Sequence, residues 1–259
     1  MKKKIELGMG ILLLAGAFLL AKEGASVVST TGAQEEKTCI VIDAGHGGDD
    51  PGKVGINGVL EKDLNLKIAL KLKSLLEDED IDVVMTRDTD EGLYDAGTDN
   101  KKVQDMRRRC EIIEKANPVM TISIHQNSYT QESVSGAQCF YFGQSEESKK
   151  LAETLQESLR TGLDPENDRV AKANETYYLL KKTSTPIVIV ECGFLTNNAE
   201  AALLMTDKYQ EKVAEAVCSG VLTYLDGGTE KENETETATE NAGGTEMTNE
   251  TETENTTEY

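Results

Sequence analysis

The 259-residue sequence has no Trp, and its five cysteines include no pair with CxxC spacing. Because their number is also odd, a disulfide framework is not expected. Cys39, Cys139 and Cys192 lie in or beside apolar, strand-like runs, which predicts small buried hydrophobic side chains. The cysteines therefore indicate core positions rather than a disulfide-stapled fold.

Basic residues are scarce, with 27 Lys and Arg against 47 Asp and Glu, which gives a net charge of −20. This balance argues against nucleic-acid binding, which needs a basic surface. Residues 227–259 hold ten Glu and one Lys among Thr and Asn, with almost no apolar residue. Such a segment cannot bury enough apolar surface to offset its ordering entropy, so we expect a disordered acidic tail.

Long apolar runs are absent except at the N-terminus, where Met1 and three lysines precede the apolar residues 8–21. This arrangement is typical of a secretory signal, and the run is short for a membrane span of about 20 residues. No clear cleavage site follows closely, so residues 1–21 are expected to be a signal peptide or an uncleaved signal anchor. Residues 22–36 predict a linker, and residues 37–226 an exported domain, either free or held by a membrane anchor.

Within residues 37–226, apolar positions alternate between the period of strands and that of helices. Strands are predicted over residues 39–42, 81–86, 119–124, 137–142, 176–180 and 187–190. Helices are predicted over residues 64–76, 102–116, 148–159, 198–205 and 208–224. This order predicts a single α/β domain with a mixed, largely parallel sheet of about six strands and helices on both faces.

Both histidines of the chain and two glutamates fall where strands end or a helix begins. His46 follows the first predicted strand, and His125 closes the third. Glu191 closes the β-branched run at 187–190, and Glu61 begins the first helix after a glycine-rich loop. Ligands bind at the C-terminal edge of the strands in open α/β sheets, so these four side chains are expected to converge. Two imidazoles and one carboxylate suit a catalytic Zn²⁺ with a position for water, and a further Glu can take a proton from that water to hydrolyse an amide.

Each of these residues also has an ordinary structural explanation. A His after a strand is commonly a hydrogen-bonding group, and the glycines around His46 can form an anion-binding turn. Their spacing, however, matches neither the Walker nor the dinucleotide motif. Glu61 alone is explained as an acidic residue at a helix N-terminus. Glu191 is harder to explain, because a carboxylate heading into a buried strand is costly unless it is paired or functional.

Four segments, in this order, resemble the zinc-dependent N-acetylmuramoyl-L-alanine amidases of the autolysin type: 41–48 (VIDAGHGG), 60–63 (LEKD), 123–127 (SIHQN) and 190–197 (VECGFLTN). The resemblance covers essentially the whole predicted domain and implies hydrolysis of the bond between N-acetylmuramic acid and L-alanine in peptidoglycan. It implies that His46, Glu61 and His125 bind one Zn²⁺ and that Glu191 is the catalytic acid and base. Open alternatives are a zinc peptidase or deacylase, and a binding module without catalysis.

Further segments resemble the germination-specific branch of this family: 85–90, 91–99, 106–109, 135–138 and 141–143. This resemblance implies a role in muramic-δ-lactam formation in the spore cortex and a lipoprotein partner. Gln126 and the acidic tail depart from the pattern of the branch.

Several arginines are candidates for binding substrate carboxylates, which guanidinium groups hold bidentately: Arg87, Arg107 to Arg109 and Arg169. For the run at 107–109, surface salt bridges on a helix are the favoured alternative. Asn127 is a further candidate substrate contact. Asp43 is expected either to orient His46 or to cap a turn.

Overall fold

The computed structural model describes residues 37–229. The predicted signal segment and linker, and all but the first residues of the acidic tail, lie outside the described residues. Among the described helices, none is both long and apolar enough to cross a membrane.

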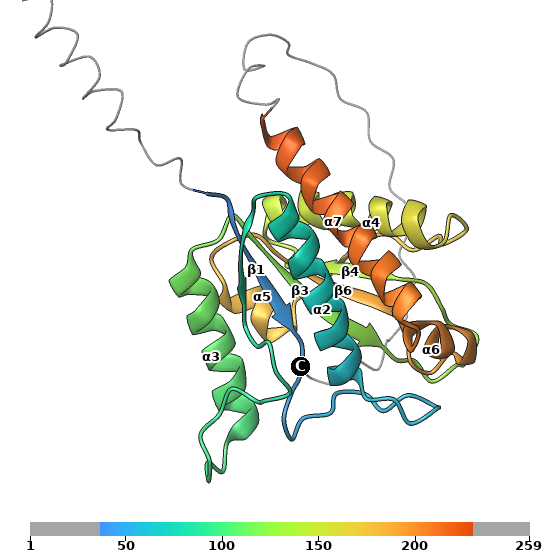
Figure 1. The fold of residues 1–259 in the computed structure, drawn as a ribbon, viewed down its shortest axis with the longest axis horizontal. Helices are drawn as coiled ribbons and strands as arrows, with labels where there is room; N and C mark the ends of the chain where they lie inside the picture. Colours follow the sequence, from blue (N-terminus) through green and yellow to red (C-terminus); the bar gives the residue numbers. More distant parts are fainter. Residues whose placement is uncertain (1–36, 230–259) are drawn as a thin grey trace, which may run out of the picture. The chain divides into compact units, whose positions relative to one another are not determined.

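The described residues form one six-stranded sheet with helices packed on it (Figure 1). The strands are β1 (Cys39–Ala44), β2 (Asp82–Met85), β3 (Met120–Asn127), β4 (Gln138–Tyr141), β5 (Lys172–Ala173) and β6 (Ile187–Phe194). The helices are α2 (Glu61–Asp78), α3 (Lys101–Ala116), α4 (Glu146–Leu163), α5 (Tyr178–Lys182), α6 (Asn198–Leu204) and α7 (Asp207–Thr229). The spatial order of the strands is β2-β1-β3-β6-β4-β5, in which β2, β1, β3 and β6 are parallel and β4 runs antiparallel to β6. The predicted α/β class and mixed sheet are confirmed.

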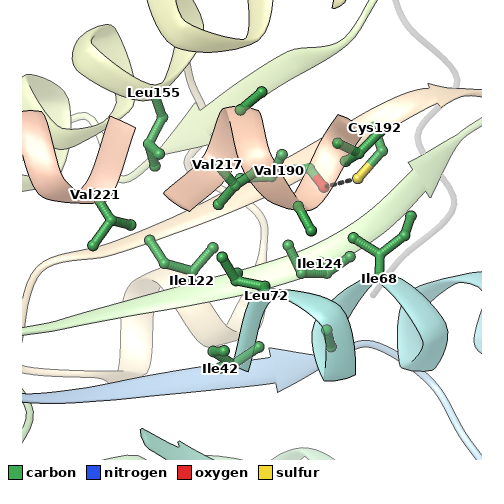
Figure 2. Packing of buried hydrophobic residues seen from close by; sticks show 14 of the residues in the cluster. Ile42, Ile68, Leu72, Ile122, Ile124, Leu155, Val190, Cys192, Val217 and Val221 are labelled. Carbon is green, nitrogen blue, oxygen red and sulfur yellow. Dashed lines mark hydrogen bonds between the residues drawn. The ribbon is translucent and has the colours of Figure 1, made fainter. Parts of the chain in front are cut away.

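Alternation along the central strands divides the core between the two faces of the sheet. Residues such as Ile122 and Val190 point to the face covered by α2, α4 and α7, where they pack against Leu72 and Val217 (Figure 2). A smaller cluster on the other face includes Val41, Ile113 of α3, Phe140, Leu179 of α5 and Ile189. Because helices cover both faces, β1 and β6 begin as continuous apolar runs (CIVI and IVIV), as in parallel sheets generally. In β3 (MTISIHQN), buried polar residues alternate with apolar ones.

The strand predicted over residues 176–180 is wrong, because residues 178–180 belong to α5 and the two residues before them lie in the turn that leads into it. The fifth strand is instead the short β5. The side chain of Asn174 explains the difference: its Oδ1 accepts hydrogen bonds from the backbone N–H groups of Thr176 and Tyr177 and turns the chain.

The five cysteines are free thiols. Cys139 and Cys192 are buried as predicted, whereas Cys39 is only half-buried.

Candidate active site and metal centre

The C-terminal ends of β1, β3 and β6 bring polar side chains to the face of the sheet that carries α3 and α5. In the register of the sheet, Asp43 lies beside Ser123, and His125 lies beside Glu191. Their neighbours of opposite parity, such as Ile124 and Val190, point into the large core on the other face. Asp43, His125 and Glu191 are nonetheless buried, because the loops after β1 cover this edge.

The loop after β1 and the start of α2 complete a cluster of three possible metal ligands. One ligand atom from each of His46, Glu61 and His125 lies within 4.8 Å of the other two. The two imidazole rings meet edge to face, with centroids 5.1 Å apart. Glu191 is adjacent to this cluster as the register neighbour of His125.

Glu61 is fully buried at the first turn of α2, and backbone groups hold its carboxylate at both oxygens. Oε1 accepts the N–H of Gln126 at 3.0 Å and lies 3.0 Å from His125 Nδ1. Oε2 accepts the N–H of Lys53 at 2.8 Å and lies 3.3 Å from His46 Nε2. Burial alone would raise the pKa of Glu61, but the hydrogen bonds to His125 and His46 lower it well below its usual range. The carboxylate is therefore ionised and aimed at both imidazoles.

His46 has a left-handed backbone conformation, with φ of 62°. Its Nδ1 lies 2.9 Å from the carboxylate of Asp50, which leaves Nε2 facing Glu61. A carboxylate on one ring nitrogen fixes the orientation of an imidazole whose other nitrogen binds metal. Burial would lower the pKa of His46, but the hydrogen bonds to Asp50 and Glu61 outweigh it and raise the pKa to about 9. The pKa of His125, in contrast, is lowered, chiefly by burial.

Two glycines make room for the cluster. A Cβ atom on Gly45 would lie closer than 3.0 Å to three atoms of the His125 ring. A Cβ on Gly52, where φ is +65°, would lie 2.5 Å from Glu61 Oε2 and 2.7 Å from His46 Cδ2. Two nitrogen donors and one carboxylate, packed against glycine backbone at a pocket, match the donor set of a catalytic zinc site with an open position.

Asp43 takes neither of the roles predicted for it. Its carboxylate accepts hydrogen bonds from Thr86 Oγ1 at 2.7 Å, Ser123 Oγ at 2.6 Å and Arg109 Nη1 at 2.7 Å. These bonds and the charge of Arg109 outweigh the effect of burial and lower the pKa of Asp43. Asp43 thus belongs to a buried network beneath the cluster.

The expectation that the arginine run at 107–109 lies on the surface is wrong for Arg109, which is 1% exposed. Arg107 and Arg108 do form surface ion pairs, with Glu111 and Asp95. The burial of Arg109 has a signal in the sequence: Asp105, Arg109 and Ile113 follow one another at intervals of four residues, which places them on one buried stripe of α3.

The candidate substrate contacts lie outside the cluster of three ligands. Arg169 donates from Nε to Ser135 O at 2.7 Å and from Nη1 to Gln138 Oε1 at 3.0 Å, and its guanidinium stacks over Phe194. Gln138, in β4, is the register neighbour of Glu191 in β6. Through its bond to Gln138, Arg169 therefore reaches the edge of the site. Asn127 is half-buried at the end of β3, where its Oδ1 accepts the N–H of Ser128.

Arg87, which was predicted to bind a substrate carboxylate, is instead buried and donates to backbone carbonyls.

A pocket between α3 and α5 opens beside the two histidines. Its walls include Lys102, Met106, Tyr177 and Tyr178.

Comparison with known proteins places this chain in a family. The family model described as N-acetylmuramoyl-L-alanine amidase matches residues 40–223. The germination-specific N-acetylmuramoyl-L-alanine amidase of Bacillus subtilis strain 168 is 38% identical over 200 residues, covering 76% of this chain and 82% of the relative.

Solved structures of amidases are also similar to this chain. The CwlD amidase of Clostridioides difficile, solved in complex with the GerS lipoprotein, is 40% identical with a TM-score of 0.72, covering 73% of this chain and 99% of that one. Amidase AmiC2 of Nostoc punctiforme is 33% identical with a TM-score of 0.63, over 73% of this chain and 97% of its own. With the family model matching most of the chain and these relatives matched over most of their length, the chain belongs to the N-acetylmuramoyl-L-alanine amidase family of peptidoglycan hydrolases.

Proposed function

We propose that this amidase is zinc-dependent, with His46, Glu61 and His125 as ligands of one Zn²⁺ and Glu191 as the catalytic acid and base. The observation that carries the proposal is the convergence of three ligand atoms within 4.8 Å, directly beside Glu191 in the sheet. When bound, zinc supplies the Lewis acidity that activates water and polarises the amide carbonyl.

The residues of the chain divide the remaining work. Glu191 accepts a proton from the attacking water and returns it to the departing amino group of L-alanine. Asp50 keeps the His46 ring in place by its contact with Nδ1. Arg169, which donates to Gln138 beside Glu191, and Asn127, at the end of β3, are proposed to contact the substrate.

Peptidoglycan is the substrate class of the family, so we propose that the chain acts outside the cytoplasm. Its similarity to a germination-specific amidase supports a role in the spore cortex, with muramic-δ-lactam formation following cleavage. The CwlD structure contains a lipoprotein, and on that similarity we propose a lipoprotein partner for this chain.

Product analysis tests the reaction. The full chain, loaded with zinc, is incubated with purified peptidoglycan, and mass spectrometry should find free stem peptides that begin with L-alanine. Cleavage of peptide–peptide bonds alone would instead establish a peptidase.

The role of Glu191 is tested by substitution. Glu191→Gln should retain zinc but lose orders of magnitude in turnover, whereas Glu153→Gln, on the exposed side of α4, should behave like the parent. Equal turnover in Glu191→Gln would refute its proposed role.

Zinc stoichiometry tests the ligands. About one zinc per chain is expected on titration, and His46→Ala or His125→Ala should abolish it. Zinc that binds equally to both variants would overturn the assignment.

The spore role has its own test. Expression of this chain in Bacillus subtilis cells that lack their germination-specific amidase should restore muramic-δ-lactam, measured by muropeptide mass spectrometry. Amidase activity without lactam would indicate a general autolysin.

A further inference from the structure

Two buried arginines converge on the loop that carries His46. Arg109 donates from Nη1 to Ala44 O at 2.8 Å and from Nη2 to His46 O at 2.6 Å. Arg87 donates from Nε to Ala44 O at 2.9 Å and from Nη2 to Gly45 O at 3.0 Å. Three consecutive carbonyl groups, at residues 44–46, are therefore each held by a guanidinium.

This loop needs external support. The left-handed region is unfavourable for a residue other than glycine, and His46 has φ of 62°. Such a conformation persists where the surroundings hold it. The carbonyl of His46 itself accepts one of the bonds from Arg109, so that bond directly restrains the peptide after the histidine.

The charge of Arg109 is balanced separately from these carbonyl contacts. Asp43 and Asp105 accept from its Nη1 and Nε at 2.7 and 2.6 Å. A guanidinium has five N–H donors, so groups that do not donate to the two carboxylates remain available for backbone carbonyls. The additional bonds to Ala44 and His46 fix a particular loop conformation, which uses the planar fork of a guanidinium.

We infer that Arg109, together with Arg87, is a positioning residue that holds the His46 loop in the conformation required for metal binding; this inference rests on the proposed role of His46 as a ligand. Neither arginine is expected to touch the metal. Removing the fork should loosen the ligand without removing any donor atom from the site.

Arg109→Lys in the full chain tests this inference. Lysine keeps the positive charge between the two aspartates, but one ammonium cannot also reproduce the fork to both carbonyls. Zinc affinity is measured by competition with a chromophoric chelator, and the absorption spectrum of the cobalt-substituted protein reports coordination geometry. We expect affinity to fall about 10–100-fold, as for other residues that orient metal ligands, with a changed cobalt spectrum. Arg107→Lys, exposed on the same helix and paired with Glu111, is the matched control and should match the parent.

Equal zinc affinity and an unchanged cobalt spectrum in folded Arg109→Lys would overturn the inference and leave Arg109 a purely structural role. If Arg109→Lys does not fold, Arg87→Lys decides by the same two measurements, because the bonds of Arg87 go to the backbone carbonyls of residues 44, 45, 62 and 89. Absence of zinc binding in the parent itself would refute the proposed metal site and the inference together.

Discussion

Replacing Glu61 with Gln is expected to destabilise the metal-free protein in addition to weakening zinc binding. The two oxygens of the carboxylate accept two different backbone N–H groups, from Gln126 and from Lys53. Glutamine offers only one oxygen, so its NH₂ group must face one of these donors in either orientation. A buried donor left without an acceptor costs about 1–3 kcal/mol. In a domain of this size, each kcal/mol lowers the melting temperature by about 2–4 °C, so a decrease of about 2–12 °C is expected.

Urea unfolding followed by circular dichroism, with a chelator present, measures the change in the free energy of unfolding. The matched control is Glu77→Gln, an exposed residue near the end of the same helix, which should change this free energy by less than about 0.5 kcal/mol. If Glu61→Gln and the parent unfold with the same free energy without metal, the carboxylate does not hold the two backbone groups, and the reasoning fails.

Three other predictions concern the same cluster. Gly45→Ala should abolish zinc binding in calorimetry, because the new Cβ would overlap the His125 ring; unchanged affinity would contradict the packing described. Below its ordinary pKa of 6.5, His46 contributes its full stabilisation to the metal-free protein through Asp50 and Glu61, and this is lost as pH rises through about 9. Chemical unfolding with chelator across this range should show that loss, and a flat profile would count against it. Zinc at 100 times its dissociation constant should raise the free energy of unfolding by about 2.7 kcal/mol, and no rise would argue against a site in the native state.

The alternation of strands and helices was predictable because β1 and β6, which are buried on both faces, begin as continuous apolar runs, whereas the helices carry apolar residues at helical spacing. The convergence of His125 and Glu191 followed from the same pattern, since both lie near the carboxyl ends of parallel strands and share a face in register. The segment at 176–180 was not predictable in this way. Its short apolar run fits a strand or a helix equally, and a side-chain contact of Asn174 decides between them.

The buried network under the site was visible only in part in the sequence pattern. A run of three arginines on a charged helix suggests a solvent-exposed face, and the position of Arg109 depends on partners from three different segments. Asp43 comes from β1, Asp105 from α3 and the carbonyl of His46 from the loop after β1. Only the Asp105 partner, four residues away, is visible as local spacing.

Glu61 had two competing explanations from sequence, as an acidic group at a helix start and as a metal ligand, and its contacts make these compatible. A carboxylate offers about four lone-pair positions. Backbone N–H groups from Lys53 and Gln126 occupy one on each oxygen, which ties the start of α2 to the loop after β1 and to the end of β3. Asn65 Nδ2 also donates to Oε1, at 3.4 Å, and the carboxylate faces His46 through Oε2 and His125 through Oε1. The group that anchors the helix is thereby presented to the cluster in a fixed orientation, although residue spacing alone supported its role as a ligand less than that of the other two.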